Sequence, residues 1–414
     1  MGRRWRVPAC GVLLLLAGPA VAAAQGRSCN LVQAADYAQL VNARGEAILY
    51  FRDPVRLRCT GDVTLAADSA VFNRSAQQME LIGSVVYRDS TSELNSDWAN
   101  YLGSIEQLLA RGDVVLTDLR DGSVVTGQDL QYLRQAPNRP VSHVIIRGGR
   151  PHAILRESPR RDPGPAPIVR PPGPDTPAPV EITADRLEFI GDTLFLARGR
   201  VELERGATTG ASDSARYSQV GERLTLLGRA HVRDDRYRLE GERIDALTSG
   251  EELREVFAQV RASLVSEELT VRSRNLRIGF VEGALDRLEA WNPAAARADS
   301  LTPLPERALA LAQEFRLRAD SIDAVADSGR LREVRAVGRA YGERRLDSLA
   351  VGVPALVARD WIQGDTIIGY FAEAMPAPGE PVPPGEAAPA APVGAAPAPA
   401  RAAGGAEGAA EADS

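Results

Sequence analysis

A repeat of about 29 residues is the feature that most constrains how this chain can fold. The segment 65–72, LAADSAVF, returns at 94–101 as LNSDWANY, so that its aspartate recurs 29 residues later (97 − 68). The glycines that follow, Gly83 and Gly112, have the same separation (112 − 83). A fixed period of this size is typical of stacked repeats, in which each unit mainly contacts its neighbours.

The same unit recurs along most of the chain. It has an apolar residue, an acid three positions later, and apolar residues two and four positions beyond the acid. Nine copies fit, with aspartate at the acid position in six. In chain order this position holds Asp68, Asp97, Gln128, Asp185, Asp213, Glu242, Arg274, Asp320 and Asp365. One unit is too small to bury its own apolar face, so we expect the copies to stack around a continuous core.

The spacing within the unit predicts a β-bulge. Alternate residues of a strand share a face, so Ala70 and Phe72 lie together, whereas Leu65 has the opposite parity. A bulge at the acid would bend the strand from one sheet layer into another. We interpret the acids as bend residues that bond nearby backbone, and the glycines as bulge residues. The bulge glycines are Gly83, Gly112, Gly199, Gly228 and Gly338. The predicted fold class is all-β, a solenoid-like stack of antiparallel sheets.

The N-terminus has the pattern of an export signal. Basic residues at positions 3, 4 and 6 precede the apolar run 12–17, and three alanines at 22–24 offer a cleavage site. The run is far shorter than the ~20 residues that a membrane-spanning helix needs. We therefore expect a signal peptide at 1–24 and a mature protein in the periplasm, either free there or associated with the outer membrane.

The remaining chain divides by composition. Repeats at 26–157 and 181–375 flank a proline-rich linker at 158–180, where proline excludes a sheet interior. The stretch 376–414 is rich in alanine, proline and glycine and is expected to be a disordered tail.

Two short segments need a separate reading. Alternating residues on either side of Asp53-Pro54 predict two short strands around a turn. The segment 304–326 also fits a helical pattern, so a short helix over 306–313 is an open alternative there, and we expect a strand from Phe315 because it falls in the repeat register.

The cysteines bear on the predicted compartment. Removal of the signal peptide would leave Cys29 and Cys59. In an oxidising compartment such a pair is expected to form a disulfide, which would attach the N-terminal segment to the first repeat. The alternative is two free structural thiols.

Signatures of catalysis and of nucleic-acid binding are missing from the sequence. His143, His152 and His231 occupy unrelated repeat positions without metal-ligand spacing. No glycine-rich phosphate loop or nucleophile elbow occurs. The net charge of −6 comes from interspersed charges rather than from a basic stripe. We expect no enzyme, no metal, no cofactor and no nucleic-acid partner.

The repeats resemble the OstA-like (LptA) family. The resemblance rests on LAADSAVF, LNSDWANY, ITADRLEF and ASDSARY, each about 15 residues before a strand such as ARGDVVL or ARGRVEL, and it covers roughly 55–371. The family includes the periplasmic bridge of lipopolysaccharide transport and the N-terminal domain of the outer-membrane translocon. It implies a tandem open β-jelly roll whose apolar groove shields acyl chains of lipopolysaccharide or a similar lipid. It also implies edge-strand pairing with LptC-like or LptD-like proteins, or between copies of the chain.

By position, the resemblance implies a set of groove-facing residues. These lipid-groove candidates are Ala70, Phe72, Ala99, Tyr101, Leu130, Tyr132, Leu187, Phe189 and Tyr217. The main alternative is a structural β-repeat scaffold or surface protein in which the same residues fill a core. A hydrolase on a repeat scaffold would need a clustered acid pair, which the sequence does not show.

Overall fold

The computed structural model describes residues 29–41, 45–156, 178–249, 252–267, 269–292, 307–312, 315–327, 330–345 and 359–371. The predicted signal peptide, the centre of the proline-rich linker and the predicted tail lie outside these ranges. Every regular element within them is a β-strand, and all strand pairs are antiparallel. The all-β class is therefore confirmed.

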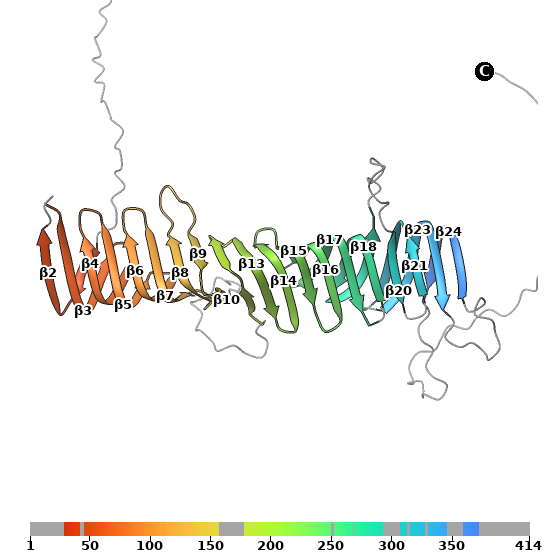
Figure 1. Cartoon of the computed structure of the whole chain (residues 1–414), viewed down its shortest axis with the longest axis horizontal. Coiled ribbons are helices and arrows are strands. Elements are labelled where there is room, and N and C mark those ends of the chain that lie inside the picture. The colour runs from red at the N-terminus through yellow and green to blue at the C-terminus, as the bar shows by residue number, and fades with distance from the viewer. Residues whose placement is uncertain are drawn as a thin grey trace, which may run out of the picture. The chain divides into compact units, whose positions relative to one another are not determined.

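The first strands cover the N-terminal repeats and follow one another in chain order (Figure 1). They are β1 (Cys29–Gln33), β2 (Asp36–Val41), β3 (Ala47–Cys59), β4 (Val63–Asn73), β5 (Gln78–Arg88), β6 (Ser92–Leu102), β7 (Gln107–Asp118), β8 (Val124–Leu133), β9 (His143–Arg147) and β10 (His152–Leu155). The register pairs Cys29 with Cys59, and their sulfurs form a disulfide that joins β1 to β3.

The later strands continue the series. They are β11 (Val180–Thr183), β12 (Arg186–Ile190), β13 (Leu194–Arg205), β14 (Thr208–Ser218), β15 (Arg223–Arg233), β16 (Tyr237–Ser249), β17 (Glu252–Ser266), β18 (Leu269–Val281), β19 (Ala284–Trp291), β20 (Ala308–Ala312), β21 (Phe315–Ala319), β22 (Ser321–Asp327), β23 (Arg330–Arg345) and β24 (Arg359–Tyr370). β9 pairs with β12 and β10 with β11, so strand pairing continues from the first block of repeats to the second.

A bulge bends the long strands at the repeated acid. In β4 the pairing with β5 skips from Ala66 to Ser69, and in β6 the pairing with β7 skips from Asn95 to Trp98. The bulge therefore lets residues of opposite strand parity face the same interior. Leu65 and Ala70 lie on opposite sides of the bulge, and both are buried. The bulge predicted from the spacing is present.

Of the local predictions, the strand from Phe315 is confirmed as β21, the turn at Asp53-Pro54 was wrong, and the helix left open over 306–313 is not found in its described part. β3 runs without a turn from Ala47 to Cys59. β4 pairs with the residues before and after Asp53-Pro54, so this dipeptide forms a bulge within β3. The helix considered over 306–313 is replaced by β20, which pairs with β18 and β21. The sheet partners supply backbone hydrogen bonds there, which outweighs the helix propensity of the Ala- and Leu-rich sequence.

Candidate functional site

The bulges divide the strands into two walls. We call wall 1 the segments on the Leu65 side, such as 63–67 of β4 and 85–88 of β5, and wall 2 those on the Phe72 side, such as 69–73 and 78–82. Apolar side chains of both walls belong to one core that extends along the described strands. The bend joins the walls on one side; we call the opposite side, where the strand connections of the two walls face each other, the mouth.

Where a bend has an aspartate, a bulge glycine lies against it for a steric reason, as in the pairs Asp68–Gly83, Asp97–Gly112, Asp185–Gly199, Asp213–Gly228 and Asp320–Gly338. Gly112 has a φ of 76°, and a Cβ added there would lie 2.9 Å from Cγ of Asp97. Gly228 and Asp213 repeat this arrangement with the same φ and the same 2.9 Å separation. The carboxylate therefore lies directly against the glycine backbone, where no other L-residue would fit without strain.

In the second block, arginine follows the bulge glycine and pairs with the aspartate. Arg200 contacts Asp185 at 2.5 Å, and Arg339 contacts Asp320 in the same way. The hydrogen bonds that these arginines donate hold the pKa of both carboxyl groups below the ordinary range. The pairs lie on the solvent side of the bend, so the aspartates act as bend residues.

The lipid-groove candidates fall into three classes of exposure. Tyr217 is exposed, with 37% of its surface accessible, and Phe72 and Phe189 are half-buried at the border of the core. The other six are buried: Ala70, Ala99, Tyr101, Leu130, Tyr132 and Leu187. Tyr217 thus differs from the rest of its set, although it occupies the same second-to-last position in β14 as the buried Tyr101 does in β6.

The mouth also contains half-buried apolar residues that the sequence reading missed. Leu224, Val232, Tyr237 and Ala246 pack against the core without being covered by it. They lie two or more positions from the bulges of β15 and β16, toward the ends of the walls. These four residues could have been identified by counting alternate strand positions outward from each bulge glycine and into the next strand.

A buried polar network crosses the mouth in the first block. Arg134, just after β8, contacts the carboxylate of Asp89, just after β5, at 3.0 Å. Tyr87 donates a hydrogen bond of 2.8 Å to the same carboxylate. Burial alone would raise the pKa of Asp89, but the bonds from Thr91 and Tyr87 and the charge of Arg134 outweigh it, so that pKa is lowered.

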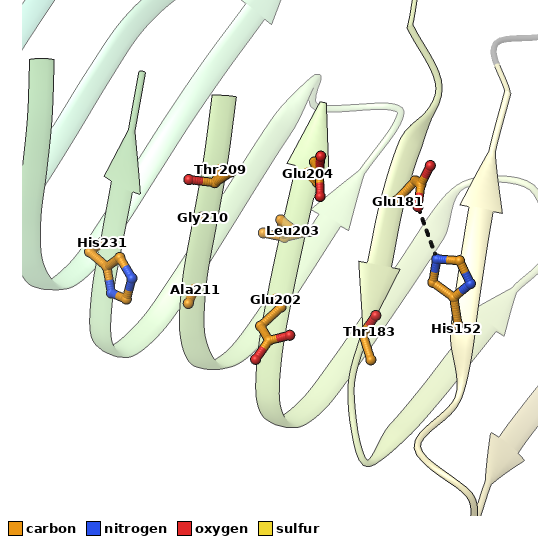
Figure 2. Close-up of a pocket in the computed structure, with 10 residues that line it drawn as sticks. All are labelled: His152, Glu181, Thr183, Glu202, Leu203, Glu204, Thr209, Gly210, Ala211 and His231. Carbon is orange, nitrogen blue, oxygen red and sulfur yellow. Dashed lines mark hydrogen bonds and ion pairs between the residues drawn. The ribbon is translucent and has the colours of Figure 1, made fainter. Parts of the chain in front are cut away.

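The outer face of wall 1 carries a shallow polar hollow of about 480 Å³ (Figure 2). His152 and His231 lie at its two ends, and Nε2 of His152 is 3.2 Å from Glu181. Among the residues that the structure describes, no group of three His, Cys, Asp or Glu side chains is placed to hold a metal ion.

Comparisons with known proteins give little further information. The chain matches no family model and no curated protein. Among solved structures, one match is LptH of Pseudomonas aeruginosa, described as the LptA-homologous periplasmic component of the lipopolysaccharide transport device. It has a TM-score of 0.27 and 18% identity, and the match covers 33% of this chain and 96% of that chain. Within the described ranges, no helix has the length and apolar character needed to cross a membrane.

Proposed function

We propose that this protein is a non-enzymatic periplasmic bridge that shields the acyl chains of lipopolysaccharide, or of a similar lipid, between the two walls of its sheet. The observation that carries the proposal is the row of half-buried apolar side chains at the mouth, which includes Phe72, Phe189 and Leu224. These residues would contact an acyl chain first, and the buried core behind them offers a continuous apolar surface.

The energetics favour a lipid over a polar ligand. Burial of an acyl chain contributes about 0.8 kcal/mol per methylene and needs no directional partner. The core that would receive it is made mainly of aliphatic and aromatic side chains. Outside the section bridged by Asp89 and Arg134, exchanging contacts between the walls for contacts with a lipid would therefore replace one apolar packing by another.

Edge strands supply the proposed contacts with partners. β2 pairs with β3, and β24 pairs with β23. Both carry exposed apolar residues, including Tyr37 and Leu40 on β2 and Trp361 and Tyr370 on β24. An exposed apolar edge is suited to strand addition by a similar β-protein, such as an LptC-like or LptD-like jelly roll, or by a second copy.

The alternative is a structural scaffold with a filled core. It is favoured by the first block, where Tyr101 and Leu108 are 1% exposed or less. In that case the walls would remain packed against each other, and the half-buried residues at the mouth would only border the core.

Site-specific photo-crosslinking in cells tests the proposal. A photoreactive phenylalanine analogue at Phe189 or Tyr217 is expected to give adducts with lipopolysaccharide. Trp98 is the matched control, because its ring lies outside the core beneath Arg111, at 5.2 Å. Adducts at both mouth positions and none at position 98 would support the conduit. A complete lack of lipid adducts at Phe72, Phe189 and Tyr217 would favour the filled scaffold.

A further inference from the structure

Among the residues that the structure describes, polar contacts join the two walls across the mouth at the following places. Asp89 meets Arg134 at 3.0 Å, and Arg120 meets Asp192 at 2.7 Å. Farther along, Nη2 of Arg236 donates a hydrogen bond of 3.2 Å to the backbone oxygen of Gly283. In each case one partner follows a strand of wall 1 and the other follows a strand of wall 2.

The contact at Asp89 differs from the other two in burial. The Asp89 side chain is fully buried and that of Arg134 is 13% exposed, whereas both side chains of the Arg120–Asp192 pair are largely solvated. Exposed ion pairs contribute little to stability, but a buried pair is costly to break by removing one partner.

The Asp89 carboxylate has a nearly complete set of hydrogen-bond donors. One oxygen accepts bonds from the backbone N–H groups of Thr91 and Ser92, each at 2.8 Å. The other receives Tyr87 and Arg134 and lies 3.5 Å from the hydroxyl of Tyr132. Arg134 also lies 3.5 Å from a carboxylate oxygen of Glu106.

Aromatic rings close the mouth beneath this network. Tyr87 belongs to wall 1, and its ring centroid lies 6.1 Å from that of Tyr132 and 6.4 Å from that of Tyr101, both in wall 2. Moving the walls apart would separate these rings and break the pair of Asp89 with Arg134 together. Wall separation in this section is therefore coupled to the ion pair.

We infer that Asp89 and Arg134 form a clasp that holds the walls together over β5–β8 and restricts access to the core there. A purely apolar contact would close the mouth at least as firmly, since buried ion pairs are seldom the most stable solution. An ion pair held by directional hydrogen bonds can instead open in one step, in which all of its bonds break together. The consequence for lipid access rests on the proposed function; the closure of the walls does not.

Thiol labelling measures the clasp without any lipid. Cys29 and Cys59 are joined in a disulfide, so a Cys10→Ser background leaves only an introduced thiol to react. Ala110→Cys places the probe in the core of β7, and Ala258→Cys places a matched probe in the distant β17; both alanines are buried. Asp89→Asn removes the charge but keeps the shape of the side chain.

Asp89→Asn is expected to speed labelling at position 110 about tenfold or more, because Arg134 loses its buried partner, and to leave position 258 unchanged. Arg134→Met should reproduce the effect. The control Asp129→Asn removes a carboxylate from an exposed ion pair with Arg111 outside the mouth and should change neither probe. Equal acceleration at both probes, an equal effect of the control, or no acceleration at position 110 would each overturn the clasp.

The lipid readout separates this inference from the proposed function. If the clasp is correct but the conduit is not, labelling changes as described while crosslinking at Phe189 and Tyr217 stays negative. If the conduit is correct but the clasp is not, those positions crosslink to lipid while Asp89→Asn leaves labelling at position 110 unaltered.

Discussion

At the scale of single residues, the repeated aspartate and glycine are explained together. Gly112 adopts a positive φ and leaves no room for a side chain beside Asp97. The two positions are therefore one structural device, although 15 residues separate them (112 − 97). The sequence correctly placed both residues at a bend. The expected bonds to backbone are replaced by bonds from side chains, as from Ser84 to Asp68 and from Arg200 to Asp185, and the contact with glycine is visible only in the fold.

This arrangement predicts the effect of adding a methyl group. Gly112→Ala should lower the free energy of unfolding by about 2 kcal/mol or more, since the left-handed backbone alone costs an L-residue about 1–2 kcal/mol and the contact with Asp97 adds to it. Denaturant titration measures the change. Gly283→Ala is the matched control, because Gly283 has a φ of 75° with nothing within 4 Å of an added Cβ. An equal loss in both variants would contradict the steric account.

At the scale of elements, the terminal strands β2 and β24 differ from the strands between them. Interior strands such as β6 and β15 pair along both edges, whereas β24 pairs with β23 alone among the described strands. The unpaired backbone edge of β24, together with its exposed apolar residues Trp361, Ile362 and Tyr370, makes it a template for another strand, and natural proteins commonly protect such edges with charge.

Edge pairing predicts association that depends on concentration. Sedimentation should show oligomers at high protein concentration, and the double variant Ile362→Lys with Tyr370→Lys should shift the distribution toward monomer, because paired edges would bring like charges together. Val220→Lys is a suitable control, since Val220 is highly exposed but lies between β14 and β15 rather than on an edge. A protein that stays monomeric at every concentration would argue against edge pairing.

At the scale of the whole described fold, the stack is close to one-dimensional. Most long strands contact the strands next to them in sequence, as β6 does with β5 and β7. In such an array, stability is approximately a sum of units and of interfaces between neighbours. Damage to one repeat is therefore expected to remain local.

Leu108→Ala tests this local character. Leu108 is fully buried in β7, and its truncation should cost about 2–5 kcal/mol. Hydrogen exchange should then show lost protection in β5–β8 and unchanged protection in β16–β19. Leu276→Ala in β18, also fully buried, should give the reverse pattern. Uniform loss of protection in both regions would show instead that the strands unfold as a single cooperative unit.

Sequence reasoning predicted the repeat, its bulge and the all-β class, because period and parity are local properties of the chain. It failed at Asp53-Pro54 and at 306–313, where pairing with distant strands outweighed turn and helix preferences. It also assigned nine inner residues to one set, although Tyr217 is exposed and Tyr101 is buried.

Which parts of the interior are closed depends on contacts between distant segments, and these are visible only in the folded chain. Asp89 and Arg134 lie 45 residues apart (134 − 89), outside the repeated motif, and neither stands out in the sequence. They meet because the bulges fold the strands into two walls whose ends face each other across the mouth. The local spacing of the repeat sets the bend of each strand and therefore the two walls. Contacts between the walls depend in addition on how many copies are stacked and bent together.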